Sequence, residues 1–138
     1  MSQTNSRRVH ALTAAAASLG AMLFATALRA QDAAPDAAKV KAGDALFNGT
    51  QLGACWACHG KAGKGTSNAP KLADAKRAWL DSDGSLEAIK GTITTGVAKP
   101  KKFPGAMPPM GGGKYTPEQV DQLAAYVYSL SHAGAKKK

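Results

Sequence analysis

The sequence predicts an all-α domain, and three observations support that prediction. Three segments carry apolar residues at the i, i+3 and i+7 spacing of an amphipathic helix. A Thr-Pro-Glu-Gln sequence, typical of a helix start, opens the last of these segments. No alternating apolar and polar run lies between hairpin turns, and only residues 92–97 favour a strand. The 138 residues support one domain with at most a short appendage.

The first thirty residues have the layout of an export signal. Arg7 and Arg8 form a positive start, an uncharged, Ala-rich run covers 11–28, and polar residues follow Ala30. This order predicts a signal peptide over 1–30, cleaved after Ala30. An uncleaved membrane anchor is the competing interpretation, because a span needs roughly 18 to 20 apolar residues.

The part of the chain that remains after cleavage is basic, keeps both cysteines and has few aromatic residues. Loss of 1–30 removes three arginines and no acidic residue, so fifteen basic and nine acidic residues leave a formal charge of +6. Both cysteines remain, in an oxidising compartment where neighbouring thiols become oxidised or chemically occupied. Aromatic residues make up 6% of the chain, so few large rings are available to fill a core. An apolar group inside a helical shell, or a small Ala/Leu-packed bundle, would supply the missing volume.

The first half of the exported part begins with a leader and a helix. Residues 31–37 are small, polar and interrupted by proline, which predicts a flexible leader. A first helix is expected over 38–48, where Val40, Gly43 and Phe47 share one face. Residues 48–53 have turn composition, and the Gly- and Lys-rich stretch 60–68 is predicted to be a loop.

The second half alternates two helices with a long loop. Leu86, Ile89 and Ile93 predict a middle helix that ends near Gly96. Residues 98–113 hold four prolines and four glycines, so we expect a wrapped loop without any regular element. Thr116 then caps a last helix, and residues 133–138 form a Lys-rich tail that we expect to be disordered. The stripe of this last helix consists of Val120, Leu123, Val127 and Leu130.

One motif carries specific chemistry. Cys55-x-x-Cys58-His59 is the arrangement that attaches c-type haem: each thiol adds to a vinyl group and the adjacent imidazole reaches the iron. Two intervening residues allow one helical turn to present both sulfurs to the same porphyrin edge. We therefore predict one haem c, bound through Cys55 and Cys58, with His59 as an iron ligand.

Other interpretations of the motif fit less well. A structural zinc site needs four ligands, and the exported part offers four candidates: Cys55, Cys58, His59 and His132. Cys58 and His59 are neighbours in the sequence and are poorly placed to bind one metal ion together. A thioredoxin-type disulfide needs a neighbouring βαβ pattern, which the sequence lacks. The third alternative is two structural cysteines that precede a histidine by chance.

The second axial ligand decides between electron transfer and chemistry at an open iron. Met107 and Met110 both lie in the Pro/Gly-rich loop. The residues alone leave three options for the second ligand: Met107, Met110 or no methionine. A methionine of this loop that is not a ligand would simply pack in the core. His/Met ligation would raise the reduction potential and leave no position for oxygen or peroxide.

With these residues in view, the chain resembles a class I cytochrome c over 38–131. The matching positions are Gly43 and Phe47 in the first helix, Cys55, Cys58 and His59 in the haem motif, Ala69-Pro70-x-Leu72, Met107-Pro108, and Leu123 and Tyr126 in the last helix. The resemblance implies a small cytochrome c fold of three to four helices wrapped around one covalently attached haem. It also implies that the N- and C-terminal helices cross at Gly43, that the Pro70 carbonyl accepts a hydrogen bond from His59, and that Met107 is the axial ligand.

Within that class, several stretches are similar to a haem domain from the dihaem subunit of cbb-type cytochrome oxidases. These stretches are Ala69-Pro70-x-Leu72, Trp79-Leu80, 89–94 and 124–130. That subunit carries two haem motifs and a membrane anchor, whereas this chain has one motif behind an apparent signal. The resemblance therefore implies a soluble relative rather than the oxidase subunit itself.

The expected function is one-electron transfer in the periplasm by a monomer, not an enzyme, with redox proteins as partners. Nucleic acid and small-molecule substrates are not expected, and membrane contact would be weak or through an uncleaved anchor. Seven lysines in loops expected near the haem predict a docking face for an acidic partner: Lys61, Lys64, Lys71, Lys99, Lys101, Lys102 and Lys114. The alternatives are a dedicated electron-accepting subunit of a periplasmic dehydrogenase or oxidase complex, and a haem sensor or peroxidase with a free axial position.

Overall fold

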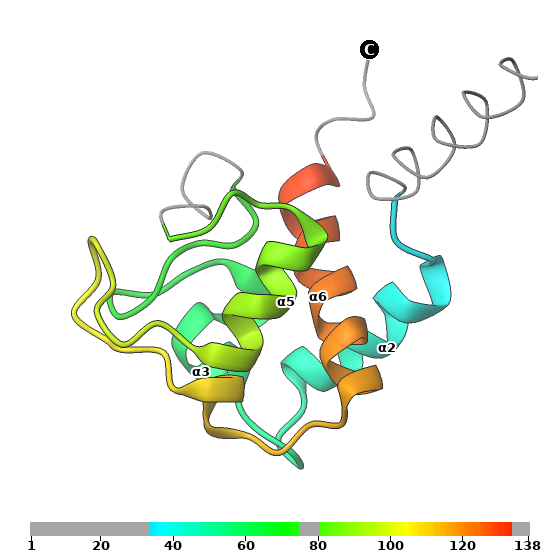
Figure 1. Ribbon diagram of the computed structural model, residues 1–138, viewed down its shortest axis with the longest axis horizontal. Helices are drawn as coiled ribbons and strands as arrows, with labels where there is room; N and C mark the ends of the chain where they lie inside the picture. The colour runs from blue at the N-terminus through cyan, green and yellow to red at the C-terminus, as the bar shows by residue number, and fades with distance from the viewer. Residues whose placement is uncertain (1–33, 75–80, 134–138) are drawn as a thin grey trace, which may run out of the picture. The chain divides into compact units, whose positions relative to one another are not determined.

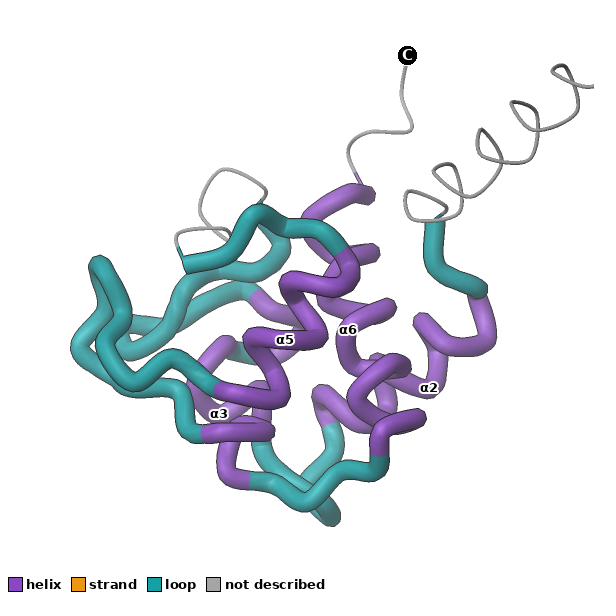
Figure 2. Tube along the Cα trace, viewed as in Figure 1, coloured by secondary structure: helices purple, strands orange, loops and turns teal. Residues whose placement is uncertain are grey.

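The computed structural model describes residues 34–74 and 81–133. The predicted signal peptide, residues 31–33 of the predicted leader, Trp79-Leu80 and the tail from residue 134 lie outside the described residues. Within the described part the fold is all-helical, as predicted (Figures 1 and 2). It consists of the helices α2 (Ala37–Asn48), α3 (Cys55–His59), α5 (Leu86–Thr95) and α6 (Pro117–His132), and the 3₁₀ turns η1 (Lys61–Gly63) and η2 (Pro109–Gly112).

Helix α2 begins at Ala37, one residue before the predicted start, because Asp36 caps it. The Asp36 carboxylate accepts hydrogen bonds from the backbone N–H groups of Ala38, at 2.8 Å, and Lys39, at 3.2 Å. Gly43 and Phe47 are the buried residues of this helix. The residue that caps α2 was therefore predicted to belong to the flexible leader.

Helix α6 starts with the predicted capping box. The Gln119 backbone N–H donates to the Thr116 hydroxyl at 3.3 Å, and the Thr116 N–H donates to the Gln119 side-chain oxygen at 2.9 Å. Pro117 takes the first helical position, where no donor is needed. Local sequence chemistry thus determines where the longest described helix begins.

Helices α2 and α6 pack against each other (Figure 1), and Gly43 lies where their backbones meet. A Cβ added at Gly43 would overlap the Gln122 carbonyl oxygen and lie 2.8 Å from the Cβ of Tyr126. Glycine is required because the two backbones touch there. The crossing of the N- and C-terminal helices is therefore confirmed.

The core lies between α2, α5 and α6. Phe47 and Leu123 are its largest fully buried side chains, and Ile89 and Ile93 of α5 pack against them. The Lys90 ammonium lies 2.7 Å from the Asp121 carboxylate and links α5 to α6 at the surface. This packing holds the three helices together on one side of the cavity described below.

The prediction that 98–113 holds no regular element is wrong in two places. Val97 and Met107 form an isolated antiparallel bridge, and residues 109–112 form η2. The turn forms because Met110 and Gly111 adopt positive φ angles of 54° and 59°, and the N–H of Gly111 donates to the Pro108 carbonyl at 2.9 Å. Similarly, η1 falls in the predicted loop 60–68, with Ala62 at φ 52°. Composition predicts the absence of long helices here but not these single turns.

Candidate functional site

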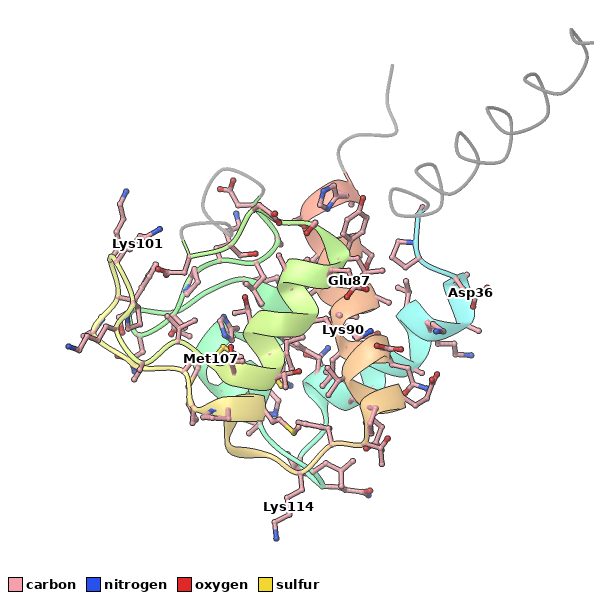
Figure 3. The ribbon with its side chains drawn as sticks, viewed as in Figure 1. Asp36, Glu87, Lys90, Lys101, Met107 and Lys114 are labelled. Carbon is pink, nitrogen blue, oxygen red and sulfur yellow. The ribbon has the colours of Figure 1, made fainter. Side chains whose placement is uncertain are left out.

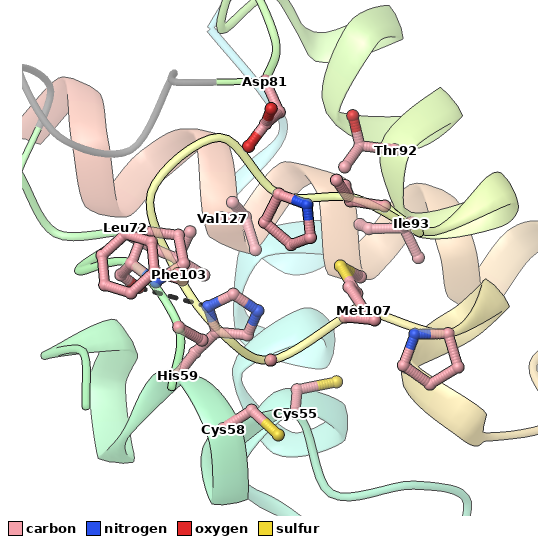
Figure 4. Close-up of a pocket in the computed structure, with 18 of the residues that line it drawn as sticks. Cys55, Cys58, His59, Leu72, Asp81, Thr92, Ile93, Phe103, Met107 and Val127 are labelled. Atoms are coloured by element: carbon pink, nitrogen blue, oxygen red, sulfur yellow. Dashed lines mark hydrogen bonds between the residues drawn. The ribbon is translucent and has the colours of Figure 1, made fainter. Parts of the chain in front are cut away.

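One apolar cavity brings together residues from across the described part of the chain (Figure 4). Phe47 of α2, Ile89 and Ile93 of α5, and Leu123 and Val127 of α6 form its apolar lining on the helical side. The loops on the other sides contribute Leu72, Pro100, Phe103, Met107 and Met110. All four predicted site residues, Cys55, Cys58, His59 and Met107, line this same cavity.

The two cysteines lie at the cavity edge on the single turn of α3. No disulfide joins them; Cys55 is partly buried and Cys58 is exposed. Burial raises the pKa of the Cys55 thiol, although a hydrogen bond with Tyr115 opposes this effect. Figure 4 shows both side chains on the same side of the cavity. They are therefore available as a pair to a group inside it.

A hydrogen bond to the backbone fixes the orientation of the His59 ring. Its Nδ1 lies 3.2 Å from the Pro70 carbonyl oxygen, which can only accept, so Nδ1 carries the proton and donates. Nε2 is then left as a neutral lone-pair donor. Burial lowers the pKa of His59, and the Pro70 carbonyl works against that effect. The hydrogen bond that the family resemblance implied is present, and it leaves Nε2 without a proton.

Met107 reaches the same cavity from the long loop. Its backbone is held by two hydrogen bonds with Val97, 2.8 Å from the Val97 N–H to the Met107 oxygen and 2.9 Å from the Met107 N–H to the Val97 oxygen. Figure 4 shows Met107 and His59 entering the cavity from different segments of the chain. A thioether and an imidazole therefore share one apolar space.

Met110 lines the cavity as well, but its backbone differs. It lies in η2 with φ at 54°, in the left-handed region that non-glycine residues seldom adopt. The next residue, Gly111, approaches the Cys55 sulfur. The structure thus brings both methionines of the loop to the cavity.

Tyr115 is a site residue that the sequence interpretation missed. Its hydroxyl oxygen lies 3.8 Å from the Cys55 sulfur. A signal was available, since Tyr115 directly precedes the Thr116 cap and Val120 is at the fourth helical position, the two positions of a hydrophobic staple. Both are buried in the same core cluster. The staple predicts burial of the ring but not contact with Cys55, which is sixty residues away in the sequence.

The lysines predicted to surround the site do not gather in one place. All seven are exposed, but Lys101 and Lys114 project from separate ends of the domain (Figure 3). Lys71, Lys99, Lys101 and Lys102 lie on two loops that meet where Gly105 approaches the Asn68 carbonyl oxygen. Residues next to these lysines, Pro70, Pro100 and Phe103, line the cavity. Four of the lysines therefore flank one side of the cavity.

The donor set fits a covalently bound haem. The motif supplies two thiols at the edge, an imidazole with a free Nε2 and, from another segment, a thioether, and most of the cavity lining is apolar. Among residues 34–74 and 81–133, no three His, Cys, Asp or Glu side chains cluster as ligands for a bare metal ion. In the same residues, no helix combines the length and hydrophobicity needed to cross a bilayer.

Comparison with known proteins agrees with this arrangement. The family model described as cytochrome c matches residues 40–131. The cbb3-type cytochrome c oxidase subunit CcoP of Rubrivivax gelatinosus is 38% identical over 104 residues, 75% of this chain and 30% of that protein. The cbb3-type oxidase subunit FixP of Sinorhizobium medicae (strain WSM419) is 38% identical over 81 residues, 57% of this chain and 27% of that protein. The chain thus spans less than a third of these relatives. No solved structure matches it significantly.

Proposed function

The chain belongs to the cytochrome c family, and from that premise we propose that it is a periplasmic one-electron carrier with a single haem c. Family membership implies covalently bound haem, which supplies an iron that changes its charge by one electron. In this proposal Cys55 and Cys58 attach the group, and His59 and Met107 ligate it. The observation that carries the proposal is that these four side chains line one apolar cavity.

His59 would act as a strong and rigid ligand. The Pro70 carbonyl holds the proton on Nδ1, so that Nε2 faces the iron without competition from protonation. The lowered pKa favours the neutral ring at periplasmic pH. The chain therefore contributes a donor that needs no rearrangement between oxidation states.

Met107 is favoured over Met110 by its backbone. Two hydrogen bonds to Val97 fix the Met107 main chain at the end of α5, so less conformational freedom opposes a weak iron–sulfur bond. Met110 instead belongs to a turn that depends on its own left-handed conformation. His/Met ligation leaves no open coordination position, which favours electron transfer over a sensor or peroxidase.

The partner in this proposal is a redox protein with an acidic face. Lys71, Lys99, Lys101 and Lys102 are exposed beside the cavity and would attract such a face over the range of a Debye length. Docking would then be fast and weakened by salt.

A second candidate is a dedicated electron-accepting subunit of a periplasmic dehydrogenase or oxidase complex. Two matched relatives carry names of oxidase subunits, and Leu52 is a large apolar side chain that is 39% exposed. Gel filtration of a native extract separates the two: a carrier elutes as a small monomer, whereas a subunit elutes with its enzyme.

The ligands are tested by a matched pair of variants, Met107→Ala and Met110→Ala, in the haem-loaded chain. We expect Met107→Ala to abolish the weak long-wavelength band of ferric His/Met haem and to lower the reduction potential. Met110→Ala should keep both properties. The reverse result would transfer the ligand role to Met110, and retention of the band in both variants would reject methionine ligation.

The docking face is tested by stopped-flow electron exchange with an acidic redox protein at increasing ionic strength. Lys99→Gln and Lys101→Gln should slow the reaction and reduce its salt dependence. Lys39→Gln, on α2, is the control because that lysine is exposed on a helix that contributes only Phe47 to the cavity. Equal effects of all three variants would mean that overall charge, not this face, controls association.

A further inference from the structure

Tyr115 occupies a closely fitted slot beside the cysteine motif. Its side chain is buried, with the residue 7% exposed. A Cβ at Gly53 would lie 2.5 Å from the Tyr115 hydroxyl oxygen, and one at Gly113 would lie 2.6 Å from the ring carbon Cε2. The Lys114 N–H donates to the Leu52 carbonyl at 3.0 Å and joins the two segments that carry these glycines. The chain therefore makes room for a phenol from both sides.

The hydroxyl of this phenol pairs with a sulfur atom. Within residues 34–74 and 81–133, the Cys55 sulfur, at 3.8 Å, is the hydrogen-bond partner of the Tyr115 hydroxyl. Packing as a hydrophobic staple would be served equally well by phenylalanine, so the staple accounts for the ring and not for the oxygen. A buried hydroxyl needs a partner, and the sulfur provides it. Burial raises the pKa of Tyr115 to about 12, so the group keeps its proton at any periplasmic pH.

We propose that Tyr115 is a positioning residue for the haem linkage: its hydroxyl donates to the Cys55 sulfur and holds it at the cavity edge, before and after the thioether forms. This inference rests on the proposed function. In the linkage step the Cys55 S–H adds across a vinyl double bond. The sulfur bonds to the inner vinyl carbon, the hydrogen goes to the outer one, and no electron is gained or lost overall.

Two consequences follow from the direction of this hydrogen bond. A sulfur held in place reacts more completely, so the Cys55 linkage should form in nearly every chain. After attachment the sulfur can only accept, and an O–H donor withdraws electron density from it. Lower electron density around the iron stabilises the reduced form, so Tyr115 raises the reduction potential.

The test compares Tyr115→Phe with wild type as full chains matured with haem. Phenylalanine keeps the ring in its slot and removes only the oxygen. We expect more singly attached protein, seen as a pyridine haemochrome band at longer wavelength because one vinyl group remains unsaturated. In the doubly attached fraction, the ratio of reduced to oxidised protein at a fixed potential should fall about two- to fivefold, the effect of one weak hydrogen bond.

Two controls make the outcome specific. Tyr128→Phe makes the same chemical change where the ring stacks on His132, with centroids 3.8 Å apart, and should alter neither readout. In a Cys55→Ala background, Tyr115→Phe should no longer shift the potential, because the sulfur is gone. An equal shift with and without Cys55, or unchanged attachment and potential in Tyr115→Phe, would overturn the inference. Either result could occur in a His/Met-ligated cytochrome, whereas a wild-type chain without haem would reject the proposed function itself.

Discussion

The contact between α2 and α6 predicts that two Gly→Ala substitutions will have opposite effects on stability. Gly43 lies where the helices touch, and Gly91 is an exposed position inside α5 with no atom within 4 Å of an added Cβ. Both are helical glycines, so alanine should improve helix propensity equally at the two sites. Only the surroundings of the new methyl group differ.

The expected magnitudes follow from those surroundings. Alanine for glycine inside a helix gains about 0.5 to 1 kcal/mol. At Gly43 the methyl group would overlap the Gln122 carbonyl oxygen and lie 2.6 Å from its carbon, and this backbone belongs to α6 and cannot rotate away. Overpacking costs about 1 to 3 kcal/mol, and rigid neighbours favour the upper end. We expect Gly43→Ala to lose about 2 kcal/mol and Gly91→Ala to gain up to about 1 kcal/mol.

The assay is urea unfolding of the haem-loaded variants followed by far-UV circular dichroism. A two-state fit gives the free energy of unfolding of each variant relative to wild type. The reasoning would be refuted if Gly43→Ala proved as stable as Gly91→Ala, because the helices could then separate without cost. A loss at both positions would instead contradict the propensity argument for α5.

Three further variants test other parts of the fold. Thr116→Ala removes the capping-box hydroxyl and should lower the free energy of unfolding by about 0.5 to 2 kcal/mol; no change in urea midpoint would mean that Pro117 alone starts α6. Leu123 is 1% exposed, so Leu123→Ala leaves a hole in the core and should lower the free energy of unfolding by about 2 to 5 kcal/mol in the same assay. A loss below about 1 kcal/mol would show that the surrounding side chains fill this hole at little cost. Because Tyr115 has a folded-state pKa of about 12 against 10 unfolded, its stabilising contribution is complete below pH 10 and is lost as pH rises toward 12. Wild type should therefore lose more stability than Tyr115→Phe over that interval, seen as a larger fall of its urea midpoint, and parallel profiles would contradict the burial of the phenol.

The helices were predictable because their causes are local. Thr116, Pro117 and Gln119 specify the start of α6 within four residues, and Ile89 and Ile93 place the buried face of α5. Gly43 was predicted as a crossing point from the family resemblance, and the structure confirms it. A short-range pattern was enough wherever neighbouring residues create the structure.

Contacts between segments that are distant in the sequence were harder to predict. Tyr115 meets Cys55 across sixty residues, and no period or cap in the sequence encodes that approach. The turns at Ala62 and Met110 require positive φ at non-glycine residues, which tertiary packing imposes against local preference. The spatial grouping of the lysines was hidden for the same reason, since their location in loops did not reveal that Lys101 and Lys114 lie apart.

The central claim is that one haem is held covalently by Cys55 and Cys58. The most direct measurement is the mass of the purified, denatured polypeptide together with its pyridine haemochrome spectrum. We predict the mass of the mature chain plus one haem, with the spectrum of a haem whose two vinyl groups are both saturated. A colourless protein with the mass of the bare polypeptide would contradict the account.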